Sequence, residues 1–391
     1  MADVPPISGF CDAHFTPVRD AFEANFRDLE ELGAGVAILV DGRPVVDMWA
    51  GWMDPGRTRS WEQDTLAAVF SVGKAMAAVC VLILVEDGSV DLDAPVSRYW
   101  PQFAAAGKGA VTVRMLLAHR AGVPAIRRSL PDAATFDWGA MAAALAEEEP
   151  WWEPGSTHGY HVNTFGFLTG ELVRRVSGES IGAFCRRRIA TRLDADFHFG
   201  IGAGDDARTA EYQLGAASHQ SVDGGEQEAV AELDGERQFL LGRVYMNPAG
   251  LSGIGTVNTR AWRAAEIPSA NAHATARAVA TIYGSLIGGG PADAIRLLRP
   301  ETVENATTEH SAGTDFVLGR PSRFGLGFQL TQPERPLGPN PRSFGHFGAG
   351  GSLGFADPDA GVAFAYAMNR SGPRWQNPRN RALIDALYAC Q

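Results

Sequence analysis

Hydrophobic residues recur along the chain with different spacings, and these spacings separate helical from extended segments. Residues 15–32 carry an apolar side chain at every third or fourth position from Val18 to Leu32, which predicts an amphipathic helix. The stretch after it, GVAILVDGRPVVDMWAGW, contains two β-rich runs around Asp41-Gly42. Because Asp-Gly is a strong two-residue turn, this stretch predicts a β-hairpin.

The next segment is apolar on every side. Residues 71–86 predict a helix with almost no polar face, and such a helix is expected in the middle of a molecule. From about residue 90 to 240 helical patterns and long loops dominate, including NTFGFLTGELVRRVSG, and a further helix is expected at 274–289. The C-terminal quarter predicts strands in GLGFQL, SFGHFG, SLGFADP and GVAFAYAMN, and then a final helix over 380–388.

Strands therefore lie near both ends of the chain, with helices between them. We expect an α/β (α+β) protein in which the early hairpin pairs with the late strands in one antiparallel sheet of a five-stranded type, flanked by helices. Residues 1–90 and 240–391 would form this α/β lobe, and residues 91–239 an all-helical lobe. Pockets favour such boundaries, so the site is expected between the lobes.

Composition limits the classes of function. The 391 residues are 45% hydrophobic and carry a net charge of −11, with basic residues scattered along the chain. No basic stripe is present, which argues against a nucleic-acid partner. The longest apolar run is too short to span a bilayer, and the N-terminus shows no signal-peptide pattern. Four widely spaced cysteines without a CxxC suit reduced thiols, and we expect a cytoplasmic protein.

Lysine is rare in this chain. Of 34 basic Lys and Arg residues, only Lys74 and Lys108 are lysines. Lys108 lies in a loop of small residues and is expected to be exposed. Lys74 lies in the most apolar predicted helix, three residues after Ser71, so the two side chains share one helix face. A buried lysine can assist removal of a serine proton; the alternative is a helix cap with a lysine that reaches solvent.

Two further stretches carry candidate chemistry. Tyr160 lies between a turn and a helix and is either catalytic or a packed aromatic residue. Residues 344–358 predict two strands joined by a glycine-rich turn, where a backbone N–H can serve as an oxyanion donor. Ser352 matches a G-x-S-x-G nucleophile motif, but no histidine follows it and the residues after it suit strands, which argues against Ser352 as the nucleophile.

Metal and nucleotide sites find little support. His158 and His161 flank Tyr160, but no third ligand is apparent, and the chain shows no HExxH motif, P-loop or dinucleotide-binding glycine pattern. We therefore expect neither a metal ion nor another cofactor.

With these stretches in order, the chain resembles the serine β-lactamase and penicillin-binding superfamily, and within it the class C β-lactamase-like esterases called family VIII carboxylesterases. The S-x-x-K motif is seen at Ser71 to Lys74, the Tyr-x-Asn element at Tyr160 to Val162, and the Lys-Thr-Gly element at His346 to Gly348. The segment MLLAHRAGVP resembles a further element of the family.

The resemblance implies roles for these residues. Ser71 would attack a carbonyl carbon, with Lys74 and Tyr160 as a general-base pair. The backbone N–H groups of Ser71 and Ala349 would hold the oxyanion. Together these roles describe a serine enzyme that forms an acyl-enzyme.

Two departures from the family pattern bear on the substrate. Val162 replaces the asparagine that binds a lactam side chain, and Asn163 is expected to point elsewhere. His346 replaces the lysine that meets a substrate carboxylate, and histidine is mostly neutral at pH 7. Both changes favour a neutral ester. His346, Gly348 and three tryptophans near Tyr160 in sequence are the candidate substrate-binding residues, the tryptophans being Trp138, Trp151 and Trp152; these three suit core packing equally well.

We therefore expect a cytoplasmic carboxylesterase for small esters. Two alternatives stay open at this stage. One is a weak β-lactamase or D-aminopeptidase on the same scaffold, and the other is a non-catalytic protein that has kept the fold. The intact Ser71, Lys74 and Tyr160 argue against the second.

Overall fold

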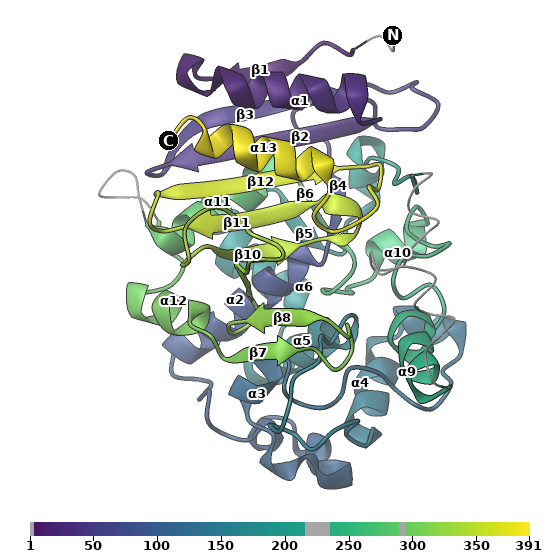
Figure 1. The fold of residues 1–391 in the computed structure, drawn as a ribbon. Helices are drawn as coiled ribbons and strands as arrows, with labels where there is room; N and C mark the ends of the chain where they lie inside the picture. Colours follow the sequence, from purple (N-terminus) through teal and green to yellow (C-terminus); the bar gives the residue numbers. More distant parts are fainter. Residues whose placement is uncertain (1–3, 216–234, 289–294) are drawn as a thin grey trace.

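One large antiparallel sheet forms the centre of the protein in the computed structural model, which describes residues 4–215, 235–288 and 295–391. Figure 1 shows the sheet with helices around it. Its strand order is β1 (Ser8–Cys11), β3 (Arg43–Gly51), β2 (Gly33–Val40), β12 (Val362–Met368), β11 (Leu353–Asp357), β10 (Phe344–Phe347), β9 (Gln329–Leu330), β8 (Pro321–Phe324) and β7 (Ser311–Thr314).

The two ends of the chain meet in the middle of this sheet. β2 pairs with β3 in the predicted hairpin around Asp41-Gly42, and it pairs with β12 on its other side, with Val36 opposite Tyr366. In Figure 1 the purple and yellow strands therefore lie side by side. The expected pairing of the early hairpin with the late strands is confirmed. The sheet extends beyond the five-stranded type through β1 at one edge and β9, β8 and β7 at the other.

Helices pack around the sheet. α1 (Thr16–Asp28) and α13 (Pro378–Tyr388) contact each other in front of it in Figure 1, whereas α11 (Ala276–Ile287) contacts β2, β11 and β12 from behind. The larger helices are α1 (Thr16–Asp28), α2 (Val72–Glu86), α4 (Trp138–Glu147), α5 (Thr164–Ser177), α9 (Gly235–Met246), α11 (Ala276–Ile287), α12 (Pro300–Thr307) and α13 (Pro378–Tyr388). The shorter ones include α3 (Val113–Leu117), α6 (Ile181–Cys185), α7 (Thr191–Leu193) and α10 (Arg260–Ala264). The helix predicted at 274–289 is confirmed from Ala276 to Ile287, whereas Ala274 lies in a strand, and residue 289 lies outside the described residues.

Helix α2 is buried along almost its whole length. Every residue from Val72 to Leu84 is buried, as the all-round apolar pattern predicts. Helix α5 and strand β10 contact it. Gly73 allows a close approach here, because a Cβ at this position would lie 2.4 Å from the carbonyl oxygen of Pro268. This packing fixes the start of α2, where Ser71 lies.

A second, small sheet was not expected from the sequence. β4 (Ala67–Phe70) pairs with β6 (Ala272–Ala274), which pairs with β5 (Phe197–Phe199). These strands have three or four residues, too few for an alternating pattern to identify them. β4 leads directly into α2 and therefore positions the start of this helix.

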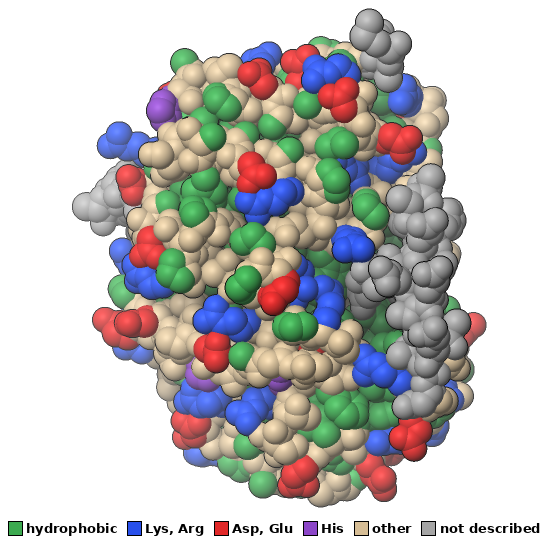
Figure 2. All heavy atoms as spheres, viewed as in Figure 1, with side chains coloured by type: hydrophobic (Ala, Val, Ile, Leu, Met, Phe, Trp, Pro, Cys, Tyr) green, Lys and Arg blue, Asp and Glu red, His purple; other side chains and the backbone are tan. Residues whose placement is uncertain are grey.

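Three features of the described residues concern cysteine, surface charge and helix length. Cys11, Cys80, Cys185 and Cys390 are free thiols. On the face seen in Figure 2, basic and acidic side chains alternate without a basic stripe. Within the described ranges, no helix has the length and apolar character needed to cross a membrane.

The expectation that Lys108 is exposed is wrong. Its side chain is fully buried, and Nζ donates hydrogen bonds to the carbonyl oxygens of Ala105, at 2.8 Å, Ala146, at 3.1 Å, and Glu148. Burial lowers the pKa of Lys108, and the neighbouring Glu148 opposes this shift. Ala146 and Glu148 lie 38 and 40 residues after Lys108 in the chain, so the local sequence around Lys108 could not reveal its burial.

We expect the Lys108→Met variant to be destabilised by about 2–4 kcal/mol, because buried carbonyl oxygens would lose their donor. Urea unfolding measures this change, with Arg128→Met as the control, since the Arg128 side chain is 63% exposed and its loss should change little. A Lys108→Met midpoint equal to that of the control would contradict a structural role for this lysine.

Candidate active site

The junction between β4 and α2 presents the hydroxyl of Ser71. Ser71 is the N-cap residue of α2, but its side chain makes no capping hydrogen bond. Phe70, just before it, has a φ of +48°, which costs a bulky residue on the order of 1–3 kcal/mol. The hydroxyl is therefore available for another role, at a turn that the surrounding packing holds in a strained conformation.

Lys74 points at this hydroxyl and not at solvent. Its side chain is fully buried, with Nζ 2.8 Å from Ser71 Oγ and 3.0 Å from the carbonyl oxygen of Ser269. Ser71 Oγ also lies within 3.2 Å of that carbonyl oxygen. This geometry excludes the alternative of a cap beside a lysine that reaches solvent. An amine at hydrogen-bond distance from a serine hydroxyl is the arrangement that proton transfer requires.

Tyr160 completes the cluster. Lys74 Nζ lies 4.8 Å from the centroid of the Tyr160 ring, and the ring is buried. It stacks parallel to Phe324 with a centroid separation of 5.8 Å and meets Trp375 edge-on at 5.5 Å. The structure thus brings Ser71, Lys74 and Tyr160 together from two segments about 90 residues apart in the chain.

Three consecutive backbone N–H groups hold the loop that carries Tyr160. The N–H of Gly159 donates to the carbonyl oxygen of His119, and that of His161 donates to His119 Nδ1 at 3.2 Å. The Tyr160 N–H donates to both carboxylate oxygens of Asp315, at 3.0 and 3.1 Å. Burial lowers the pKa of His119 well below its usual value, so its Nδ1 can act as an acceptor. His119 belongs to the segment MLLAHRAGVP, and this contact gives that segment a structural role.

The glycine-rich turn between β10 and β11 lies against the same junction. Ser352 is fully buried, and its Oγ donates to the carbonyl oxygen of Val69 at 3.0 Å. Gly348 is required here, because a Cβ would lie 2.0 Å from Ser352 Oγ and 2.4 Å from the carbonyl oxygen of Val69. Ser352 thus attaches the turn, with Ala349 in it, to the strand that precedes Ser71, and its hydroxyl is used in that contact.

His346 lies behind Tyr160. It is fully buried, its ring centroid is 5.9 Å from that of Tyr160, and its Nδ1 is 2.7 Å from the carbonyl oxygen of Phe347. Burial and the neighbouring Lys74 lower the pKa of His346 to about 3. The imidazole is therefore neutral above that pH. The His346 side chain has no exposed surface. Its predicted role in substrate binding therefore stays a prediction.

The residues after Tyr160 follow the expected departure from the family pattern. Val162 is buried, and the amide of Asn163 donates to the carbonyl oxygen of Val244 and to Ser252 Oγ, both at 2.8 Å. The Asn163 amide is therefore used in these two contacts, which attach the start of α5 to Val244 and Ser252.

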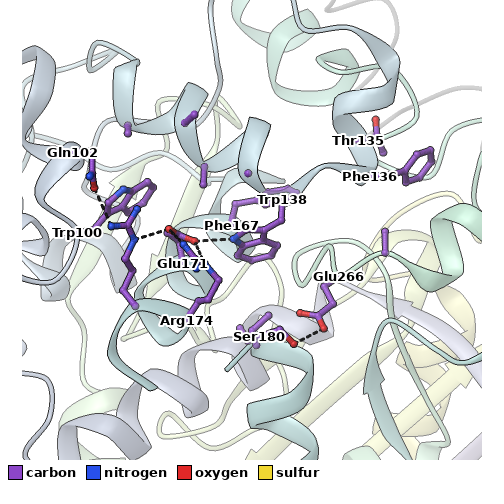
Figure 3. Close-up of a pocket in the computed structure, with 17 residues that line it drawn as sticks. Trp100, Gln102, Thr135, Phe136, Trp138, Phe167, Glu171, Arg174, Ser180 and Glu266 are labelled. Carbon is purple, nitrogen blue, oxygen red and sulfur yellow. Dashed lines mark hydrogen bonds and ion pairs between the residues drawn. The ribbon is translucent and has the colours of Figure 1, made fainter. Parts of the chain in front are cut away.

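The three tryptophans do not form one surface. Trp152 contacts His161 and Phe316 beside the Tyr160 loop, and Trp151 donates to the carbonyl oxygen of Ala125. Trp138 is elsewhere: Figure 3 shows it in a separate pocket of about 730 Å³, where its indole N–H donates to Glu171 at 2.8 Å. None of Ser71, Lys74 and Tyr160 lines that pocket. Proximity in sequence misled the interpretation of Trp138, because α4 turns its side chain toward α5.

Sequence reasoning also missed several residues that shape the site. Ser269 contributes a carbonyl oxygen to Ser71 and Lys74, and its Oγ accepts from the Gly166 N–H at 2.7 Å. A backbone acceptor leaves no signal in a sequence. Trp375, in the loop before α13, was detectable only as an aromatic residue in a region rich in Gly and Pro. As for metals, the described residues contain no group of three or more His, Cys, Asp or Glu side chains placed to hold an ion.

Comparisons with known proteins show which family the chain belongs to. The family model described as Beta-lactamase matches residues 20–389. The Esterase/beta-lactamase LipL of Mycobacterium tuberculosis is 36% identical over 93% of this chain and 83% of its own length. A solved family VIII carboxylesterase superposes with a TM-score of 0.88 at 39% identity, over 99% of this chain and 100% of that one. A penicillin-binding protein homologue from Caulobacter crescentus gives a TM-score of 0.89 at 37% identity, with the same coverage.

The chain therefore belongs to the β-lactamase family. The fold class expected from the sequence and the resemblance to class C β-lactamase-like esterases are both confirmed.

Proposed function

We propose that this protein, a serine hydrolase of the carboxylesterase type, hydrolyses small, short-chain acyl esters through a covalent acyl-enzyme on Ser71. The observation that carries the proposal is the distance of 2.8 Å between Lys74 Nζ and Ser71 Oγ, in a buried cluster that includes Tyr160. The esterase relatives support the reaction class, and the substrate and the roles of the residues are our inference.

Acylation begins with attack of Ser71 Oγ on the ester carbonyl carbon. The hydroxyl proton passes to the pair of Lys74 and Tyr160 while the new C–O bond forms. The oxyanion accepts hydrogen bonds from the backbone N–H groups of Ser71 and Ala349, the first of which is strengthened by the N-terminus of α2. Collapse of this intermediate breaks the bond to the alcohol oxygen, and Tyr160 returns the proton to the leaving alkoxide.

Deacylation repeats these steps with water as the nucleophile. The pair of Lys74 and Tyr160 accepts a proton from water, which attacks the acyl carbon. The bond from the acyl carbon to Ser71 Oγ then breaks, and Ser71 recovers its proton as the carboxylic acid leaves. No redox step or co-substrate other than water is needed.

We infer the substrate class from the two departures from the family pattern. The neutral His346 offers no cation to a substrate carboxylate, and Val162 offers no amide to a lactam side chain. Trp152 and Phe316 supply apolar surface beside the Tyr160 loop. These features favour neutral esters with small apolar groups. The cytoplasmic location and the division into an α/β lobe and a helical lobe stay predictions.

A β-lactamase activity is the second candidate, because the relative LipL carries both names. We expect kcat/KM for a short-chain p-nitrophenyl ester to exceed that for nitrocefin by about tenfold to a hundredfold. A hydrogen bond between two charged groups contributes about 1.5–3 kcal/mol, which corresponds to this range of rate ratios. The neutral His346 cannot form such a bond with a lactam carboxylate.

The pH dependence follows from the same side chain. Because the pKa of His346 is about 3, lowering the pH from 8 to 5 leaves it uncharged and should not raise the relative activity on nitrocefin. Steady-state kinetics at both pH values provide the measurement. Equal turnover of the two substrates would replace the esterase assignment with the lactamase one.

A further inference from the structure

The hairpin formed by β7 and β8 contacts Tyr160 at its backbone and at its ring. Asp315, the first residue after β7, accepts the backbone N–H of Tyr160, and Phe324 at the end of β8 stacks on the tyrosine ring. The hairpin therefore contacts both the backbone and the ring of the tyrosine that the mechanism uses. These contacts join segments more than 150 residues apart in the chain.

Asp315 is itself held in one position. Its side chain is fully buried and accepts the N–H groups of Val317 and Leu318, both at 2.9 Å, and the hydroxyl of Ser322 at 2.8 Å. His158 Nε2 lies 2.9 Å from Ser322 Oγ, and the carbonyl oxygen of His158 accepts the N–H of Phe316. A buried carboxylate is costly unless it is fully hydrogen-bonded, and this one is surrounded by donors.

The Asp315 carboxylate accepts hydrogen bonds that are not needed to close the turn of the hairpin. The turn is already closed by backbone hydrogen bonds between Asp315 and Arg320 and between Gly319 and Asp315. The hydrogen bonds from the Tyr160 N–H to the carboxylate add nothing to that turn, but they hold the backbone of Tyr160, whose ring centroid lies 4.8 Å from Lys74 Nζ. A shift of about 1 Å in a catalytic group can cost about a hundredfold in rate.

We infer that Asp315 is a positioning residue that sets the place of the Tyr160 hydroxyl for proton transfer. This inference rests on the proposed role of Tyr160. The inference predicts that the loss of activity depends on the leaving group of the ester, because Tyr160 protonates the leaving alkoxide. An alkyl alkoxide needs that proton in order to leave, whereas p-nitrophenolate leaves without it. Loss of the Tyr160 position should therefore slow alkyl esters more than p-nitrophenyl esters of the same acid.

The experiment compares kcat/KM of the full-length Asp315→Asn variant for ethyl butyrate and p-nitrophenyl butyrate. Active sites are counted by fluorophosphonate titration, so that unfolded protein is excluded. We expect a loss of about a hundredfold for the ethyl ester and about tenfold or less for the nitrophenyl ester. Tyr160→Phe should show the same discrimination, and the double variant should lose less than about threefold beyond Tyr160→Phe.

Asp357→Asn provides the matched control. Asp357 is also fully buried and accepts four hydrogen bonds, from Asn340, Tyr388 and two backbone N–H groups, but it is the last residue of β11, outside the β7–β8 hairpin. Its variant should lose stability and leave the ratio of the two esters unchanged. Ser322→Ala keeps the carboxylate and removes one of its donors. It should also slow the ethyl ester more than the nitrophenyl ester, with smaller losses than Asp315→Asn, and it replaces that variant if Asp315→Asn fails to fold.

The outcomes separate the two proposals. Equal losses on both esters in Asp315→Asn, or in Ser322→Ala where that variant replaces it, would overturn the positioning role while Ser71 and Tyr160 keep theirs. If Tyr160→Phe itself fails to discriminate between the esters, or if Ser71→Ala remains active, the proposed mechanism fails instead.

Discussion

Replacement of Ser71 by alanine should reduce kcat for ester hydrolysis by at least about 10⁴-fold, because a serine hydrolase without its nucleophile keeps only binding and oxyanion stabilisation. The Ser71 hydroxyl makes no cap to its helix and lies 2.8 Å from Lys74 Nζ. Its loss should therefore affect the reaction far more than the fold. The measurements are steady-state turnover of p-nitrophenyl butyrate and the melting temperature of the same preparation.

Ser352→Ala is the control for this prediction, because Ser352 lies in the G-x-S-x-G sequence and its hydroxyl donates a hydrogen bond to the carbonyl oxygen of Val69. We expect a loss of about 1–3 kcal/mol in stability from the unpaired carbonyl and retention of the covalent chemistry. A fluorophosphonate probe should label Ser71 in the wild type and in Ser352→Ala. Labelling of Ser352, or a fully active Ser71→Ala variant, would refute the assignment of the nucleophile.

Lys74→Met and Tyr160→Phe should each lower kcat for ethyl butyrate by about 10³-fold, within the range typical of general acid–base groups. The double variant should be only slightly worse than either single variant. Lys74 Nζ lies close to both Ser71 Oγ and the Tyr160 ring, so the two side chains serve one proton-transfer step. Groups that act as a unit show such non-additive losses.

The chain offers a matched control for each substitution. Lys108→Met removes the only other lysine, which is equally buried, and Tyr283→Phe removes the hydroxyl of another fully buried tyrosine, on α11. Both control variants should keep kcat within about threefold of the wild type after correction for active enzyme. Losses that multiply in the double variant, or a control that loses as much as its partner, would contradict shared proton transfer.

Local patterns in the sequence predicted the elements that carry strong periodicity. The hairpin at Asp41-Gly42, the buried helix α2 and the C-terminal strands β10, β11 and β12 lie where the patterns placed them. Such elements depend on side chains that are near one another in the chain, so their period is visible in the sequence. The short strands β4, β5 and β6 were missed, because pairing with distant segments alone makes them strands.

The sequence by itself determined the groups that we propose to react: a serine and a lysine one helical turn apart, a tyrosine beyond them and a glycine-rich turn near the C-terminus. Only the tertiary structure decided which neighbours these groups have. It buried Lys108 against carbonyl groups, turned Trp138 into another pocket and placed Asp315 under the backbone of Tyr160. The physical reason is that helix periodicity and turn chemistry act over a few residues, whereas burial and hydrogen-bond partners depend on segments that meet only when the chain packs.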